Sequence, residues 1–281
     1  MIEVLRTGLY TSIQDEGRLG YQHFGIPIGG AMDLGAMHEA NRLLGNPKNS
    51  AVLEMSFQGP KLLFHRTTQI AVRGALMEIR LNNQRVESVN VITIKKNDLL
   101  QFGAAYHGKR AYLAVPGGFQ SEEIFGSQSQ YKGLTKFATV KKNELLPIGI
   151  TTQNHKSIIP TLPSPQTQKK IIQVYKGPEY SFIEKKDRKR VLSDVFTISL
   201  QNSRMAYLLE EKLKQHQASL WTGPVLPGTV QYTPSGRLIM LMRDAQTTGG
   251  YPRILQITDE GLNRLAQMST HDQFQFELVE I

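Results

Sequence analysis

The stretch Met77-Glu78-Ile79-Arg80-Leu81-Asn82-Asn83 indicates the kind of fold that this chain adopts. Apolar residues take every second position from Met77 to Leu81, and charged residues stand between them. Successive side chains of a β-strand point to opposite faces, so this alternation is typical of a strand with one buried face. The pair Asn82-Asn83 predicts a turn directly after the strand.

Similar patterns recur along the rest of the chain. They predict further strands at 89–94, 111–115, 171–175, 196–200, 238–242, 253–258 and 274–278. Helical patterns are fewer: 34–44, which Asp33 can cap, 259–268, and, by composition, 208–217. Strands outnumber helices, and strands and helices do not alternate regularly. The sequence therefore predicts mainly β structure (β-rich α+β), as barrels or sandwiches rather than a doubly wound sheet.

The domain organisation follows from one proline-rich stretch. Residues 151–170 contain three prolines among small polar residues, which favours an extended linker over a packed element. We therefore expect an N-terminal domain over 1–155 and a C-terminal domain over 171–281. Arg18-Leu19-Gly20-Tyr21 resembles Arg204-Met205-Ala206-Tyr207, and this weak internal repeat favours a duplicated domain.

Composition excludes several function classes. The 281 residues include no cysteine, which rules out disulfides, thiolate metal sites and a cysteine nucleophile. The net charge of +9 has one dense cluster at 185–190, without the interleaved aromatic residues of a nucleic-acid site. That cluster favours a solvated helix end or a dock for an acidic partner. With no bilayer-length apolar run and no signal peptide at Met1-Ile2-Glu3-Val4, we expect a cytoplasmic protein that binds no membrane.

Two familiar kinds of site are absent from the sequence. Residues 103–110 approach a phosphate-binding loop, but Arg110 replaces the required Ser or Thr and a strand follows, so a hairpin turn is favoured. The seven histidines form no pair at metal-ligand spacing, so we predict no bound metal.

Three polar stretches remain as candidate chemistry. Gln14-Asp15-Glu16-Gly17-Arg18 could hold a general base beside an anion-binding arginine, or could be a surface turn with an internal ion pair. In 243–252, Gln246, Thr247 and Thr248 suit an amide or carboxylate, and Gly249-Gly250 permits positive φ and close ligand approach; the alternative is a plain hairpin turn. At 29–33, Asp33 favours a helix cap over an anion site.

Taken in order, these stretches and several others form a set of motifs that covers nearly the whole chain. The set comprises Gly8-Leu9-Tyr10-Thr11-Ser12-Ile13-Gln14-Asp15, Gly17-Arg18, Gly20-Tyr21, Gly30-Ala31-Met32-Asp33, Ala40-Asn41, Gly45-Asn46-Pro47, Leu53-Glu54, Gly59-Pro60, Tyr112-Leu113-Ala114-Val115, Ser203-Arg204-Met205, Pro227-Gly228 and Gln246-Thr247-Thr248-Gly249-Gly250-Tyr251-Pro252. It resembles the biotin-dependent carboxyltransferase family, also called allophanate hydrolase subunit 2 or KipA-like. Freestanding members of about this length are similar to the C subunits of 5-oxoprolinases.

The resemblance implies a fold and a set of partners. The expected fold is two tandem cyclophilin-like β-barrel domains. The expected partners are a KipI-like protein (the B subunit) and a LamB/YcsF-like protein (the A subunit), which together complete an ATP-dependent 5-oxoprolinase that opens the lactam of 5-oxoproline to glutamate. In fused urea carboxylases, the same module moves a carboxyl group from carboxybiotin to urea.

Residue roles follow from the family motifs and from residue chemistry. A phosphorylated lactam oxygen needs cationic donors, which Arg18, Arg204 and Arg243 could supply. Asp15 is the expected base or magnesium ligand. The expected catalytic residues are therefore Asp15, Arg18 and Arg204, and the expected substrate-binding residues are Tyr21, Arg243, Gln246, Thr247 and Thr248. ATP and Mg²⁺ are expected to be handled by the complex, and no biotin is attached to this chain, which lacks a Met-Lys-Met carrier motif.

Gln128, Ala206 and Leu208 depart from the family pattern, which often has arginine, glycine and arginine there. Two other functions stay open: a carboxyltransferase that acts on urea or a related amide with a biotinylated partner, and a non-catalytic antagonist of a KipI-like kinase inhibitor.

Overall fold

A computed structural model describes residues 1–87, 91–149, 170–218 and 220–280. In it the alternating stretch forms the end of a long strand, β5 (Thr68–Leu81). The turn that follows has positive φ at Asn82 (50°) and Asn83 (69°). Met77 and Ile79 are buried in an apolar core, as the alternation predicts.

Packing divides the chain into two units. Unit 1 comprises Met1–Gly17 with Asp33–Pro165, and unit 2 comprises Arg18–Met32 with Gln166–Ile281. The predicted linker at 151–170 lies outside the described residues except for Lys170. The predicted domain limits stay a prediction, and the grouping of Arg18–Met32 with unit 2 is not visible in the sequence.

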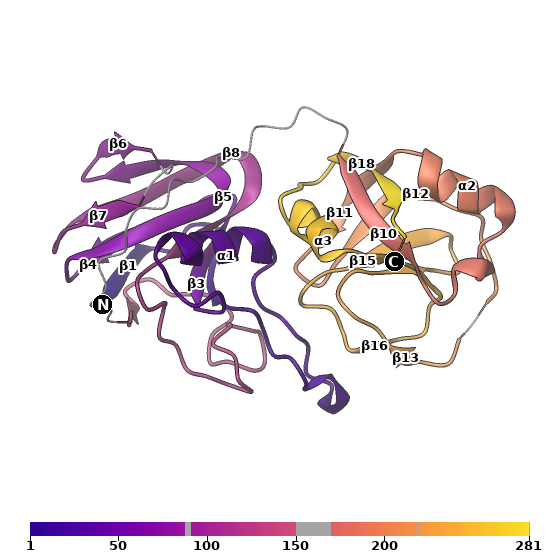
Figure 1. Ribbon diagram of the computed structural model, residues 1–281, viewed down its shortest axis with the longest axis horizontal. Coiled ribbons are helices and arrows are strands. Elements are labelled where there is room, and N and C mark those ends of the chain that lie inside the picture. Colours follow the sequence, from indigo (N-terminus) through magenta and orange to yellow (C-terminus); the bar gives the residue numbers. More distant parts are fainter. Residues whose placement is uncertain (88–90, 150–169, 219, 281) are drawn as a thin grey trace. The chain divides into compact units, whose positions relative to one another are not determined.

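The described residues of unit 1 form a nine-stranded sheet, and Figure 1 shows helix α1 beside it. The strands run in the order β2-β3-β8-β4-β1-β9, and β5 pairs with β6, β7 and β8. The elements are β1 (Ile2–Arg6), β2 (Tyr10–Gln14), α1 (Leu34–Leu43), β3 (Val52–Ser56), β4 (Lys61–Phe64), β5, β6 (Gln84–Val86), β7 (Ile92–Ile94), β8 (Leu99–Ala114) and β9 (Leu145–Leu146).

Helix α1 begins as the sequence predicts. The Asp33 side chain accepts a hydrogen bond from the Ala36 N–H, which satisfies one of the unpaired donors at the helix start. The Asp33 N–H donates to the Tyr112 hydroxyl at 2.8 Å. Burial raises the pKa of Tyr112 well above its usual value, and the nearby Glu54 and Asp33 carboxylates raise it further. Asp33 is therefore a structural cap.

Unit 2 is a closed barrel of seven strands in the order β10-β17-β14-β15-β12-β11-β18. A separate two-stranded ribbon pairs β13 with β16. The elements are η1 (Gln22–Phe24), β10 (Ile171–Lys176), η2 (Tyr180–Phe182), α2 (Lys185–Ser193), β11 (Phe196–Asn202), β12 (Ala206–Lys212), β13 (Gly223–Pro224), β14 (Thr229–Tyr232), β15 (Arg237–Leu241), β16 (Thr248–Gly249), β17 (Arg253–Ile257), α3 (Asp259–Ala266) and β18 (Gln273–Leu278).

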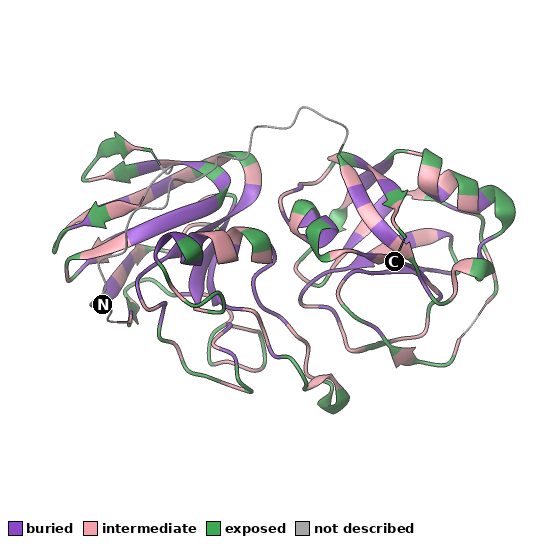
Figure 2. Cartoon of the chain, in the orientation of Figure 1, coloured by how far each residue is buried: buried purple, intermediate pink, exposed green. Residues whose placement is uncertain are grey.

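The core of unit 2 fills the barrel. Its ring cluster includes Phe196, Phe274 and Phe276, and the ring centroids of the last two lie 5.0 Å apart, edge to face. Figure 2 shows the buried residues along the strands and a largely exposed α2, in which Asp187 and Val191 are the buried positions. The mainly β fold class is confirmed.

Two local predictions are wrong. Residues 208–217 are not helical: β12 covers Ala206–Lys212 and pairs with β11 and β15 in the barrel wall. Residues 103–110 are not a hairpin turn, because they lie inside β8, which continues through irregular pairing with β5. Gly108 has a φ of 73° within that strand, which is typical of a β-bulge.

None of the helices in the described part of the chain has the length and apolar character that a bilayer crossing requires.

Candidate functional site

Asp15 lies just after β2, in unit 1, and its carboxylate is surrounded by donors. Oδ1 accepts hydrogen bonds from Ser127 Oγ (2.6 Å), Ser129 Oγ (2.5 Å) and Gly17 N (2.8 Å). Oδ2 accepts from Gln128 N at 2.6 Å. A carboxylate offers about four acceptor positions, so this buried group is well occupied. The geometry favours a role in holding the 126–129 turn, and a catalytic role for Asp15 stays a prediction.

Gln128, one of the departures from the family pattern, contacts the Asp15 carboxylate through its backbone N–H. Its side-chain Nε2 instead donates to the Ser121 carbonyl at 3.1 Å. The other two departures, Ala206 and Leu208, lie in β12.

The segment Arg18–Met32 belongs to unit 2. The Arg18 side chain is fully buried and its backbone N–H donates to the Ile28 carbonyl at 2.7 Å. Met32 packs in the barrel core. Because Asp15 and Arg18 are both buried, the alternative of an ordinary surface turn at 14–18 is wrong. Tyr21 is half-buried and precedes η1, and its carbonyl accepts from Phe24 N at 3.0 Å.

Two predicted arginines hold the middle of this segment. Arg204 Nη2 donates to the Gly30 carbonyl at 2.6 Å, and Gly29 N donates to the Arg243 carbonyl at 2.9 Å. Arg204 also forms a two-pronged ion pair with Asp244, through Nε (2.8 Å) and Nη2 (3.0 Å). Paired bonds of this kind fix the plane of a guanidinium. Arg204 therefore joins the 243–245 turn to the 18–32 segment.

Arg243 is almost completely buried, and its Nη2 reaches Asp259 Oδ1 at 3.3 Å at the start of α3. The Asp259 side chain is largely exposed. The pair therefore joins a buried cation to a solvated carboxylate.

The residues Gln246, Thr247 and Thr248 lead into the β13–β16 ribbon. Gln246 and Thr247 are half-buried, and Thr248 is exposed. The Thr247 carbonyl accepts from Val225 N at 3.0 Å, and Thr248 pairs with Pro224. The motif thus forms one strand of a short antiparallel ribbon.

The sequence shows that these two glycines permit positive φ, but neither Gly249 nor Gly250 adopts it. A Cβ on Gly249 would lie 2.3 Å from Nε2 of Gln231. A Cβ on Gly250 would meet its nearest neighbour, the Leu220 carbonyl oxygen, at 3.5 Å, an ordinary contact. A Cβ at Gly249 would therefore force the end of the Gln231 side chain to move.

Gln231 is a residue that sequence reasoning missed. Its neighbours on β14, Val230 and Tyr232, point into the barrel core, so Gln231 points to the opposite face of the wall. It is nevertheless only 1 % exposed. Among the described residues, Nε2 is buried without a hydrogen-bond partner. No signal in the sequence distinguishes this glutamine from others.

The ribbon is held by a second network that the sequence did not reveal. Glu179 accepts from Arg253 through N (2.9 Å), Nε (2.9 Å) and Nη2 (2.6 Å). Arg253 Nη1 donates to the Pro224 carbonyl at 3.0 Å. Hydrogen bonds from Arg253 lower the pKa of Glu179, and Glu179 in turn raises the pKa of Arg253. This pair connects the chain before η2 to β13 and β17.

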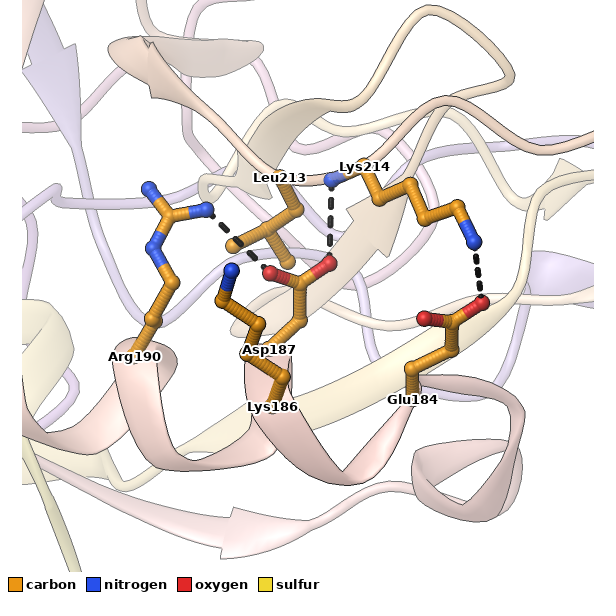
Figure 3. A pocket seen from close by; sticks show the side chains of 6 residues that line it. All are labelled: Glu184, Lys186, Asp187, Arg190, Leu213 and Lys214. Carbon is orange, nitrogen blue, oxygen red and sulfur yellow. Dashed lines mark hydrogen bonds and ion pairs between the residues drawn. The ribbon is translucent and has the colours of Figure 1, made fainter.

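A pocket of about 280 Å³ lies beside α2. Figure 3 shows its lining side chains, Glu184, Lys186, Asp187, Arg190, Leu213 and Lys214. Its charges largely pair with one another: Arg190 Nη1 donates to Asp187 Oδ1 at 3.2 Å, and Lys214 Nζ to Glu184 Oε1 at 2.6 Å. The basic cluster at 185–190 lies in the first part of helix α2, with part of its charge compensated locally, and a dock for an acidic partner stays a prediction. None of the predicted site residues lines this pocket.

The structure therefore distributes the predicted residues unevenly. Asp15 belongs to unit 1, and the other seven belong to unit 2. Within unit 2, Arg204 and Arg243 both contact the segment that contains Arg18 and Tyr21. Within residues 1–87, 91–149, 170–218 and 220–280, no three His, Asp or Glu side chains gather as they would around a metal ion.

Comparison with known proteins relates this geometry to a family. The family model described as "Carboxyltransferase domain, subdomain A and B" matches residues 24–278. The chain belongs to this family. The resemblance inferred from the ordered motifs is thereby confirmed.

Among curated relatives of this carboxyltransferase-family chain, the 5-oxoprolinase C subunit of Escherichia coli is 32 % identical over 95 % of this chain and 88 % of the relative. The protein of the same name from Haemophilus influenzae is 31 % identical over 100 % of this chain and 92 % of its own length. Among solved structures, the urea amidolyase of K. lactis superposes with a TM-score of 0.89 at 27 % identity. That match covers 99 % of this chain but spans only 19 % of the urea amidolyase chain.

Proposed function

We propose that this chain is a subunit of an ATP-dependent 5-oxoprolinase, which converts 5-oxoproline to glutamate. The observation that carries the proposal is the match in length. The chain spans 88 % and 92 % of the two relatives named as 5-oxoprolinase C subunits, but 19 % of the urea amidolyase. A likeness over nearly the whole of a relative supports a shared role more strongly than a likeness to one module of a fused enzyme.

The reaction needs ATP because a lactam is a poor electrophile. In the first step of the proposed reaction, the γ-phosphoryl group moves from ATP to the lactam carbonyl oxygen and ADP leaves. Water then adds to the ring carbon, the ring C–N bond breaks, and the nitrogen takes a proton. A second water molecule releases phosphate. Catalysis of such a transfer is mostly positioning and charge stabilisation, which requires fixed cations and fixed hydrogen-bond donors.

Unit 2 contributes the fixed cations in this proposal. Arg204, held in plane by Asp244, and the nearly buried Arg243 both contact residues 18–32. We assign Arg18, Arg204 and Arg243 to anion binding, and Tyr21, Gln246, Thr247 and Thr248 to orientation of the lactam and its carboxylate. Asp15, in unit 1, holds the turn at Ser127–Ser129, and its role as a catalytic residue stays part of the proposal.

ATP and Mg²⁺ are assigned to the whole complex. The described residues of this chain offer no cluster of carboxylates that suits Mg²⁺, and the Asp15 carboxylate is already occupied by four donors. The partners in this proposal are a KipI-like protein and a LamB/YcsF-like protein, and the proposal attaches no biotin to this chain.

The direct test is reconstitution. This chain is co-purified with its candidate KipI-like and LamB/YcsF-like partners, and ADP and glutamate are measured with and without 5-oxoproline. We expect ATP hydrolysis that depends on 5-oxoproline and on this chain. A well-folded complete complex that hydrolyses no ATP in response to 5-oxoproline contradicts the proposal.

The site assignment is tested by Arg204→Lys, which keeps the charge and loses the two-pronged bond to Asp244. We expect turnover to fall at least about ten-fold, because bidentate recognition is not replaced by lysine. The matched control is Arg264→Lys, since Arg264 also pairs with a carboxylate but on the exposed face of α3. Equal turnover in the two variants contradicts the role of Arg204.

A second candidate function rests on the structural likeness to the urea amidolyase. In that case the substrate is urea or a related amide, and the carboxyl donor is a biotinylated partner. The same complex is therefore assayed with urea and a carboxybiotinylated carrier. Carboxyl transfer there, without a response to 5-oxoproline, favours this second function.

A further inference from the structure

The Gln231 amide is a polar group that the fold of unit 2 buries and leaves unsatisfied. A buried donor without a partner destabilises a folded protein, and more than nine in ten buried polar groups in proteins have one. Gln231 is 1 % exposed, and among the described residues its Nε2 has no hydrogen-bond acceptor. An apolar side chain of the same size would fit the position at lower energetic cost.

The surroundings of Gln231 connect it to the candidate ligand-binding motif. The amide lies on the outer face of the barrel wall and packs against Gly249 of the β13–β16 ribbon. The absence of a Cβ at Gly249 gives the amide its space, because that atom would lie 2.3 Å from Nε2. One residue before Gly249 is Thr248, which is assigned to ligand binding. The unsatisfied amide is therefore adjacent to that motif.

The β13–β16 ribbon, which covers the Gln231 amide, is short. It consists of two pairs, Gly223 with Gly249 and Pro224 with Thr248. Trp221, two residues before β13, is 99 % exposed and makes no packing contribution to the ribbon. Such a short two-stranded element depends on its anchors for stability. Here the anchors are the buried Val225 and the bond from Arg253 to the Pro224 carbonyl.

We propose that Gln231 is a ligand-binding residue, whose side-chain amide donates a hydrogen bond to a carbonyl or carboxylate oxygen of the substrate when the β13–β16 ribbon shifts aside. The chemical class of ligand is a small molecule with an exposed carbonyl or carboxylate acceptor. The inference rests on the proposed function, because that function supplies such a ligand, 5-oxoproline. It adds a specific donor and a moving element that the family motifs do not include.

The test is the variant Gln231→Met, which keeps the side-chain size and removes the amide. It is compared with Gln256→Met, a matched control on the neighbouring strand β17. The Gln256 amide is satisfied: Oε1 accepts from Thr229 Oγ1 at 3.0 Å, and Nε2 donates to the Pro227 carbonyl at 2.8 Å. The thermal midpoint is measured for each purified chain, and the affinity for 5-oxoproline is measured by calorimetry in the complex with the partner proteins.

We expect opposite results for the two variants. Gln231→Met keeps or raises the thermal midpoint and weakens 5-oxoproline binding by about ten- to a hundred-fold, the loss of one hydrogen bond to a charged or strongly polar acceptor. Gln256→Met lowers the midpoint and leaves the affinity unchanged.

Three results overturn the inference. Wild-type affinity in Gln231→Met shows that the amide does not bind the ligand. A loss of thermal stability comparable with that of Gln256→Met shows that the amide serves the fold. Both of these results leave the proposed function standing. Absence of 5-oxoproline binding in the wild-type complex instead overturns the proposed function, and the inference with it.

Discussion

The ion pair between Glu179 and Arg253 makes a sharp prediction about stability. Glu179→Ala removes three hydrogen bonds that Arg253 donates, at 2.9, 2.9 and 2.6 Å. The Arg253 guanidinium, which also donates to the Pro224 carbonyl, is then no longer held in place by a carboxylate. The Arg253 and Glu179 side chains are 29 % and 17 % exposed, so water replaces only part of what is lost.

The expected magnitude follows from these contacts. A hydrogen bond to a charged group contributes about 1.5–3 kcal/mol, and bonds within one pair are not additive, so the loss is about 2 kcal/mol in the free energy of unfolding. That corresponds to a fall of about 4–8 °C in the thermal midpoint. The matched control is Glu184→Ala, which removes an ion pair with Lys214 whose side chains are 61 % and 65 % exposed. Water screens a pair as exposed as this one, so the free energy of unfolding of Glu184→Ala should stay close to that of wild type.

The same pair predicts a pH dependence. Arg253 lowers the pKa of Glu179 below its ordinary value of 4.5. A carboxyl group with a lowered folded-state pKa contributes stability that is present above the unfolded-state pKa and is lost as the pH falls through the folded-state pKa. The difference between wild type and Glu179→Ala, measured by urea denaturation, is therefore full at pH 7 and shrinks below about pH 4.5. A difference that is the same at pH 7 and pH 3, or one no larger than that of Glu184→Ala, refutes this reasoning.

Three further predictions concern the candidate site. Gly249→Ala should lower the free energy of unfolding by about 1–3 kcal/mol, because its Cβ would overlap the Gln231 amide. Gly250→Ala should change that free energy by less than about 0.5 kcal/mol. Denaturant titration of both variants tests this, and equal losses contradict it. Asp15→Asn should destabilise the protein by about 2 kcal/mol in thermal denaturation, because one amide cannot accept hydrogen bonds from four donors. Unchanged stability with lost turnover would instead indicate catalysis by Asp15. Arg204→Lys should lower stability by about 1–3 kcal/mol as well as turnover, and a variant of wild-type stability contradicts the contact geometry.

Much of the fold follows from local patterns. The alternation at Met77–Leu81 places a strand correctly because one of its faces is buried, and Asp33 caps α1 because its side chain reaches the Ala36 N–H. Residues 208–217 mislead, since leucine, glutamate and lysine favour a helix in isolation. In the barrel, Tyr207 and Leu209 point inward from β12 and alternate with outward side chains, and this burial outweighs the local propensity.

The site is less accessible to sequence reasoning, because its contacts join residues far apart in the chain. The motifs single out Arg204, but not its bond with Gly30, which lies 174 residues away. Glycine at position 249 permits positive φ, but Gly249 does not adopt it, and the atom nearest to an added Cβ belongs to a side chain on β14. Likewise, the isolation of the Gln231 amide depends on which strand covers it, and composition and spacing do not encode this.

The proposed oxoprolinase function is tested most directly by the yield of glutamate per ATP hydrolysed, in a complex of this chain with the proposed KipI-like and LamB/YcsF-like partners. The account predicts one glutamate formed for each ATP that 5-oxoproline causes to be hydrolysed, with neither product formed when this chain is omitted. ATP hydrolysis and glutamate formation that proceed unchanged without this chain contradict it.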